Sequence, residues 1–244
     1  MLNLMAFSMP THTNTENLQI ILRWAHFLAG ITWIGLLYFF NLINVPFMKS
    51  VTEAPMRQHI FKNLTLPALF WFRWGAVVTV FAGFWYWAQT IVAVDAHNGG
   101  GNAGAAIGLF LLLWTVTFAI EYAIVLKAPD IAAINKGPVF AVIAAILLGA
   151  AAYLFVNMNM HGWESSRMIS IGIGGGFGWV MMFNVWGIIW RNNKKIINGA
   201  LAGTPAPDAA KLARQAFLAS RTNAWLSIPM LFFMAAASHY VIFG

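Results

Sequence analysis

The sequence predicts an all-α integral membrane protein, a bundle of six transmembrane helices with both termini on the outer side. Hydrophobic residues make up 60% of the chain and charged residues only 9%, whereas a soluble domain carries about 25% charged residues. Six apolar stretches approach or exceed the roughly 20 helical residues that cross a hydrocarbon core of about 30 Å. Lys and Arg gather in alternate loops between these stretches, as they do in multi-pass membrane proteins.

Each apolar stretch predicts one helix. The polar residues before the first stretch lack the basic start and apolar run of a secretion signal, so we expect an outer N-terminal tail over 1–19 and one six-helix domain over 20–244. The last stretch contains Pro229, which usually kinks a membrane helix rather than ending it. The predicted spans are 20–45, 68–94, 103–126, 139–156, 168–190 and 224–243.

Three segments between or within the spans have a distinctive composition. The Gly-rich stretch 98–104 predicts a flexible outer turn. The glycines of the fifth span form small-x-x-x-small pairs, which favour close packing against a neighbouring helix or a flat cofactor. Residues 208–221 follow a Pro-rich break and mix apolar with basic side chains, which predicts an interfacial helix on the inner side.

The orientation follows from the basic residues. Eleven of the 14 Lys and Arg residues lie in the three loops 49–62, 127–136 and 191–221, and the positive-inside rule places these loops in the cytoplasm. Both termini then face outward, which in a bacterial inner (plasma) membrane is the periplasm. The sequence pI of about 10.0 reflects charges beside anionic lipid, so we expect no nucleic-acid partner.

The chain contains no cysteine. Disulfides, thiolate metal sites, iron–sulfur clusters and covalently attached c-type haem all need cysteine sulfur and are therefore excluded within this sequence. Any metal would be held by His, Met or oxygen ligands.

Two ionisable residues lie about 10 Å from the inner ends of their predicted helices. Arg73 is in the second span and Glu121 is in the third. Burying either charge alone is costly, so their matched depth predicts a structural ion pair. A proton-relay carboxylate is the alternative role for Glu121.

Histidines concentrate on the outer side, where five of the six fall. His26 and His239 lie in the first and last spans at depths of about 9 and 6 Å, and two imidazoles on two helices can ligate the iron of haem b. Arg23, one turn outward of His26, could pair with a haem propionate. The alternative is that each histidine only hydrogen-bonds a neighbouring helix.

A second metal hypothesis concerns the outer loop after the fourth span. Met158, Met160 and His161 combine thioether and imidazole ligands, a set that selects Cu(I), and His97 or His12 could add to it. Methionine also fills irregular gaps in helix bundles, so copper binding is an alternative to haem.

Three strings resemble one known family. They are RWAHFLAGITWIGLLYFFN at 23–41, NVWGIIW at 184–190 followed by Lys194 and Lys195, and the last span from SIPM at 227–230 through Ser238, His239 and Tyr240. These strings resemble the N-terminal domain family of membrane-bound urate oxidase (urate hydroxylase). The first helix is more distantly similar to membrane haem-binding protoporphyrinogen oxidases and copper-resistance membrane proteins, which implies that His26 is a ligand.

The resemblance implies a redox function. Long members of the family oxidise urate and carry a periplasmic cytochrome c domain after their spans, but this sequence has no Cys-x-x-Cys-His. We therefore expect a haem b protein that exchanges electrons with a periplasmic cytochrome c or another membrane subunit, as a urate oxidase-like oxidoreductase or as an electron-transfer subunit. The rival hypothesis is a non-catalytic accessory subunit of a larger respiratory or oxygenase complex.

Overall fold

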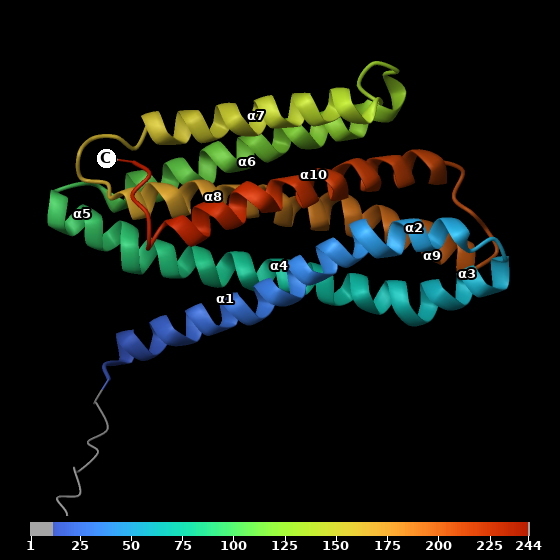
Figure 1. Cartoon of the computed structure of the whole chain (residues 1–244), viewed down its shortest axis with the longest axis horizontal. Coiled ribbons are helices and arrows are strands. Elements are labelled where there is room, and N and C mark those ends of the chain that lie inside the picture. Colours follow the sequence, from blue (N-terminus) through green and yellow to red (C-terminus); the bar gives the residue numbers. More distant parts are fainter. Residues whose placement is uncertain (1–11, 244) are drawn as a thin grey trace, which may run out of the picture.

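The computed structural model describes residues 12–243, which form helices and connecting loops with no strand among them (Figure 1). The first helix, α1 (Asn14–Tyr38), begins inside the predicted tail because Thr13 and Glu16 form a capping box. The rest of the predicted tail, 1–11, lies outside the described residues. A π-helical segment (Phe39–Asn44) joins α1 to α2 (Val45–Ser50).

The remaining helices run back and forth along the bundle (Figure 1). They are α3 (Ala54–Ile60), a π-helical segment (Phe61–Thr65), α4 (Leu66–Trp87), a π-helical segment (Ala88–Val92) and α5 (Ala93–Gly99), then α6 (Ala103–Lys127) with a 3-10 turn (Ala128–Asp130) and α7 (Gly137–Asn157). The last group is α8 (Ser166–Asn184), a π-helical segment (Val185–Trp190), α9 (Arg191–Leu201) and α10 (Ala209–Ala236).

Five continuous helical stretches of the described chain are long and apolar enough to cross a membrane. They are Asn14–Ser50, Ala54–Gly99, Ala103–Asp130, Gly137–Asn157 and Ser166–Leu201, and each contains one of the first five predicted spans. This all-helical, membrane-like architecture agrees with the predicted fold class.

The structure differs from the prediction at the sixth span. The expected interfacial helix over 208–221 and the expected span over 224–243 form one helix, α10, which continues through Pro229 and ends at Ala236. Its first half packs in the bundle through Leu212, Gln215 and neighbouring residues, so the mixed apolar and basic pattern marks a buried face and a polar edge. At that edge Lys211 pairs with Asp130 at 2.6 Å.

The glycine-rich helix α8 forms the centre of the bundle. Most of its residues are buried, and it contacts α4, α6, α7 and α10. A Cβ atom at Gly172 would overlap the Phe155 ring, and one at Gly176 would overlap the Trp114 ring. The glycines therefore allow the close helix packing that their spacing predicts.

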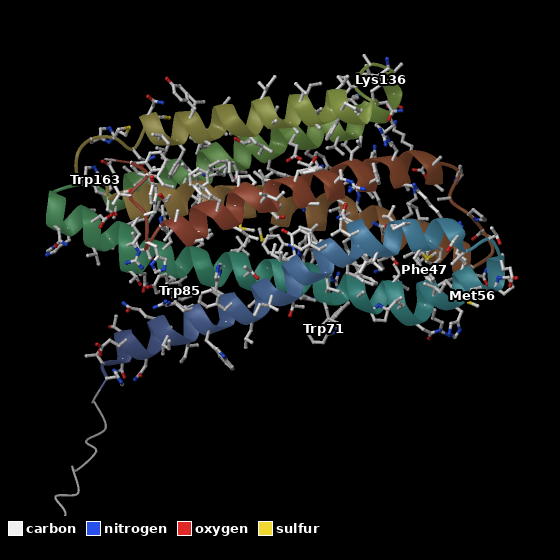
Figure 2. All side chains as sticks on the ribbon, viewed as in Figure 1. Phe47, Met56, Trp71, Trp85, Lys136 and Trp163 are labelled. Carbon is white, nitrogen blue, oxygen red and sulfur yellow. The ribbon has the colours of Figure 1, made fainter. Side chains whose placement is uncertain are left out.

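Lys136 and Trp163 mark opposite ends of the bundle in Figure 2. The end with Lys136, together with α2, α3 and α9, holds the three basic loops and is called the basic end below. The end with Trp163 also holds α5 and residues 237–243, and is called the opposite end. Trp71 and Trp85 on α4 are exposed apolar side chains, as suits a surface that faces lipid.

Candidate functional site

A cavity of about 480 Å³ lies between α1, α4, α8 and α10 in the half of the bundle near the opposite end. Aromatic rings form much of its wall, including Trp33, Phe84, Trp87, Phe110 and Trp179. Gly174, Gly175 and Gly178 of α8 also line it, on a different side of the helix from the tightly packed Gly172 and Gly176. The glycine-rich helix thus presents both a packing surface and a flat cavity wall.

His26 of α1 lines this cavity in a defined orientation. Its Nδ1 atom lies 2.7 Å from the carbonyl oxygen of Thr79 on α4. A carbonyl oxygen can only accept a hydrogen bond, so Nδ1 carries the proton and Nε2 keeps its lone pair. An imidazole oriented in this way by a backbone carbonyl is a typical metal ligand in proteins.

Gly83 of α4 makes room for this imidazole. A Cβ atom at Gly83 would lie 2.5 Å from Nδ1 of His26, closer than real contacts allow. Any larger residue at this position would push the ring away from Thr79. The orientation of His26 therefore depends on a glycine in the neighbouring helix.

Two arginines place positive charge beside His26. Arg23 of α1 and Arg167 at the start of α8 both line the cavity, and the Arg23 guanidinium lies 5.7 Å from the centre of the Tyr86 ring. Among the described residues, no carboxylate lies within ion-pair distance of either guanidinium. The two arginines can therefore bind anionic groups of a ligand, such as carboxylates.

The fourth side of the cavity comes from α10 and carries thioether groups. Met230, Met234 and Ser238 all line the cavity. The i, i+4 spacing places the two methionines on one face of α10, and Ser238 follows the end of the helix. Sequence reasoning missed Arg167, Met230 and Met234. The four-residue spacing of the two methionines was a signal for a shared helix face, but it could not show what that face contacts.

The structure does not bring the predicted pair His26 and His239 together at the cavity. Because α10 ends at Ala236, His239 lies in the following turn with its side chain exposed. Ser238 lines the cavity, whereas His239 is not among its lining residues. The predicted depth of His239 assumed that the helix continues to the end of the apolar run.

The predicted ion pair between Arg73 and Glu121 is not formed among the described residues, and the two side chains have other partners. The segment from Asn184 to Trp190 contacts both residues' helices, since Asn184 donates to Glu121 and Trp186 donates to the Arg73 carbonyl. The Arg73 guanidinium lies 3.9 Å from the centre of the Trp190 ring, whereas Glu121 accepts hydrogen bonds from Asn184. Matched depth can pair two residues only where no other segment lies between their side chains.

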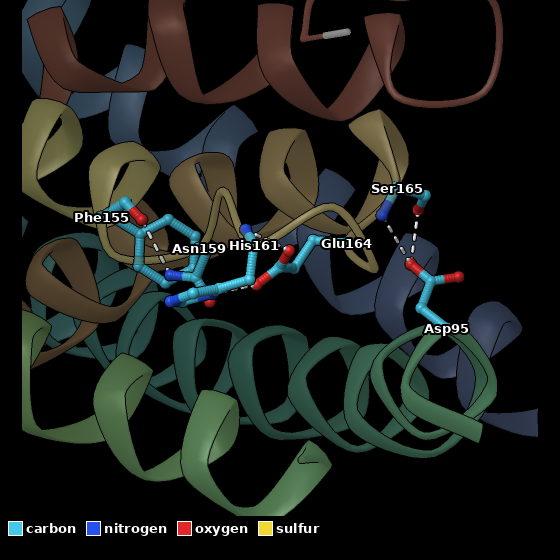
Figure 3. A network of polar contacts seen from close by, with 6 residues as sticks. All are labelled: Asp95, Phe155, Asn159, His161, Glu164 and Ser165. Atoms are coloured by element: carbon cyan, nitrogen blue, oxygen red, sulfur yellow. Dashed lines mark hydrogen bonds and ion pairs between the residues drawn. The ribbon is translucent and has the colours of Figure 1, made fainter. Parts of the chain in front are cut away.

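The outer loop proposed for copper forms a hydrogen-bonded turn (Figure 3). Glu164 accepts from the His161 backbone N–H at 2.9 Å and from its Nδ1 at 2.7 Å, and Asp95 of α5 accepts from the Ser165 hydroxyl. Met158 and His161 line a shallow cavity of about 250 Å³, which Met160 does not reach. Within residues 12–243, no three His, Asp or Glu side chains form a group that could hold a metal ion.

Fold and cavity together define a membrane-type helical bundle with an imidazole and two arginines at a largely aromatic cavity. The chain belongs to the urate oxidase N-terminal family, whose model matches residues 55–244. The matched segment includes α4, α8 and α10 but starts after α1, so His26 and Arg23 lie outside it. No curated protein and no solved structure matches the chain.

Proposed function

We propose that this chain is an integral membrane redox protein that binds haem b in the cavity and exchanges electrons with a periplasmic cytochrome or a partner subunit. The orientation of His26 carries the proposal, because its Nε2 lone pair borders a cavity of suitable size. Ligand cavities of about 300–1,000 Å³ hold molecules of this class. Bound haem would supply one-electron chemistry.

The other lining residues fit the same ligand. Arg23 and Arg167 would pair with the two propionates, and the aromatic wall would cover the apolar face of the macrocycle. Gly175 and Gly178 leave a flat surface where larger side chains would intrude. Gly174 lets α10 approach closely, because a Cβ there would lie 3.1 Å from the Met230 carbonyl oxygen. The arginines thus match the carboxylates at one edge of an amphipathic planar ligand. The aromatic rings and the glycines match its flat apolar faces.

A second iron ligand is available on α10. Met230 and Met234 line the cavity, and a methionine thioether with a histidine is a known haem ligand pair that raises the reduction potential. We therefore propose a methionine of α10 in the role that the sequence assigned to His239. The proposal predicts a higher potential than a bis-histidine site would have.

The position of the cavity supports the proposed electron partner. It lies toward the opposite end, away from the basic loops, and the positive-inside rule puts that end on the periplasmic side. A periplasmic cytochrome or a subunit exposed there would come closest to the cavity edge. Electron exchange at that surface would need no path through the whole bundle.

The test is a reduced-minus-oxidised absorption spectrum of the purified protein with pyridine haemochrome quantification. We expect a stoichiometric b-type band that His26→Ala abolishes and His239→Ala leaves intact. His26→Gly should recover the band when imidazole is added, and Met234→Ala should shift it. Protein that contains copper without haem, or a band indifferent to His26, would overturn the proposal.

A further inference from the structure

Glu121 of α6 is a buried carboxyl group that the proposed haem site does not use. Only 1% of the residue is exposed. Both carboxyl oxygens accept from the Asn184 side-chain amide, at 3.1 and 3.2 Å. The same amide donates to the Asn223 side chain at 3.0 Å, and Asn223 donates to the Met181 carbonyl at 2.9 Å. The carboxyl therefore ends a chain of amides that joins α6, α8 and α10.

No positive charge compensates this carboxyl group among the described residues. The cations on the surrounding helices are held elsewhere: Arg73 lies over Trp190, Arg214 is bonded to Asn135 and Arg221 lies over Phe217. The Tyr38 hydroxyl is bonded to Ser227, and the Tyr122 ring packs against Gly187. An ionised carboxylate in this apolar interior would be strongly disfavoured.

A second observation indicates that the cluster has two hydrogen-bonding states. The side-chain oxygen of Asn184 is buried and has no hydrogen-bond partner, although buried polar atoms normally have one. Rotating this amide by half a turn, together with the Asn223 amide that it now donates to, would aim the Asn184 oxygen at Glu121. There it could accept a hydrogen bond only from a protonated carboxyl. The present orientation suits the ionised form, and the rotated orientation suits the protonated form.

A second pair of buried amides lies between Glu121 and the basic end. Asn192 donates to the Gln215 side chain at 3.0 Å, and Gln215 donates to the Leu126 carbonyl at 3.0 Å. The side-chain oxygen of Asn192 is also buried without a partner. Gln215 precedes Asn223 by two helical turns, about 12 Å along the axis, so the two amide pairs form successive polar layers.

We propose that Glu121 is a proton-binding site in the membrane interior, which exchanges protons with the basic end through the layer of Asn192 and Gln215. A hydronium ion at that end loses a proton and becomes water, and the proton forms an O–H bond on the Glu121 carboxylate. The Asn184 and Asn223 amides rotate together, so that the Asn184 oxygen accepts a hydrogen bond from the new O–H group. The reverse steps return the proton to the same water. The binding step needs no cofactor.

Glu121 also lies near the cavity, so proton binding there can influence electron transfer. This consequence rests on the proposed function. Asn184 follows Gly178 of the cavity wall by six residues, about 9 Å along the helix. A proton taken up at Glu121 would offset the negative charge of an electron arriving in the cavity. The reduction potential of the bound haem should then depend on pH and lose that dependence in Glu121→Gln.

Infrared spectroscopy of the reconstituted protein tests proton binding independently of haem. We expect the C=O stretching band of a protonated carboxyl at neutral pH, shifted in D2O, lost in Glu121→Gln and retained at a shifted position in Glu121→Asp. The exposed carboxyl variant Glu53→Gln should leave the band unchanged. A spectrum without any band that depends on Glu121 would overturn the proposal, even if haem binds normally.

The route from the basic end has its own test. Asn192→Leu should slow hydrogen–deuterium exchange of the Glu121 band about tenfold, the rate equivalent of losing roughly 1.4 kcal/mol of stabilisation along the path. Asn193→Leu is the matched control, because the neighbouring Asn193 side chain bonds only the Ile189 carbonyl. Equal exchange rates in the two variants would show that protons reach Glu121 by another path.

Discussion

At the scale of single residues, the cavity depends on a few close approaches that a sequence pattern cannot show. The His26 imidazole reaches the Thr79 carbonyl only because Gly83 has no side chain. Arg23 was expected beside the site because it precedes His26 by about one helical turn. Arg167, in contrast, comes from a helix that begins more than a hundred residues later, and only the packing of α8 brings it to the same cavity.

Gly83→Ala should displace His26 and weaken cofactor binding. The added Cβ would lie 2.5 Å from Nδ1, so the ring must move and the hydrogen bond to Thr79 must break. The measurement is haem content by pyridine haemochrome, with Gly108→Ala as control, because a Cβ at Gly108 meets nothing within 4 Å and Gly108 does not line the cavity. Equal haem content in both variants would contradict the role of Gly83.

At the scale of elements, the composition of α8 indicated close packing, and the structure divides its glycines between two functions. Gly172 and Gly176 face rings of α7 and α6, whereas Gly174, Gly175 and Gly178 line the cavity. The ends of elements were harder to predict. Where α10 begins and ends depends on its partners, since α9 and the loop after α6 hold its first half in the bundle.

Gly176→Ala should destabilise the bundle without touching the cavity. Its Cβ would overlap the Trp114 ring, which is fully buried, and overpacking of this kind costs about 1–3 kcal/mol. Unfolding in mixed micelles with increasing SDS, followed by tryptophan fluorescence, would measure the loss. Gly149→Ala on α7 is the control, because a Cβ there meets nothing within 4 Å and should be neutral or slightly stabilising.

The loop between α7 and α8 should lose stability in acid. Burial raises the pKa of the Glu164 carboxyl, but hydrogen bonds from the His161 side chain and backbone outweigh it, so the pKa lies below its ordinary value of 4.5. The stabilisation is therefore complete above pH 4.5 and disappears as the pH falls through the lowered pKa. Hydrogen exchange at the His161 amide should accelerate over that interval, beyond the intrinsic pH effect, but not in Glu164→Gln.

At the scale of the whole molecule, the charge distribution and the position of the cavity together support the proposed electron exchange at the periplasmic side. The basic loops gather at one end of the bundle and the cavity lies toward the other. The family match covers the helices that form three sides of the cavity, while α1 supplies His26 from outside the matched segment. The orientation of the bundle in the membrane remains a prediction, and it can be measured directly.

The lack of cysteine allows a clean test of that orientation. A single cysteine in place of Lys136 or Met160, which lie in loops at opposite ends, can be labelled with a membrane-impermeant thiol reagent. In spheroplasts we expect labelling of Met160→Cys and protection of Lys136→Cys until the membrane is permeabilised. The reverse pattern would place the basic end outside and refute the proposed periplasmic electron exchange.

The sequence by itself determined the helical, membrane-like architecture, the family and the likeness of α1 to a ligand-bearing helix. These properties depend on local composition and spacing, because partition into lipid and helix formation are decided along short stretches of chain. Only the tertiary structure decided that Arg73 and Glu121 have different partners, that α10 ends before His239, and that Arg167, Met230 and Met234 share a cavity with His26. Those outcomes depend on which helices pack together and where each one ends, and packing between distant segments leaves no periodic signal in the chain.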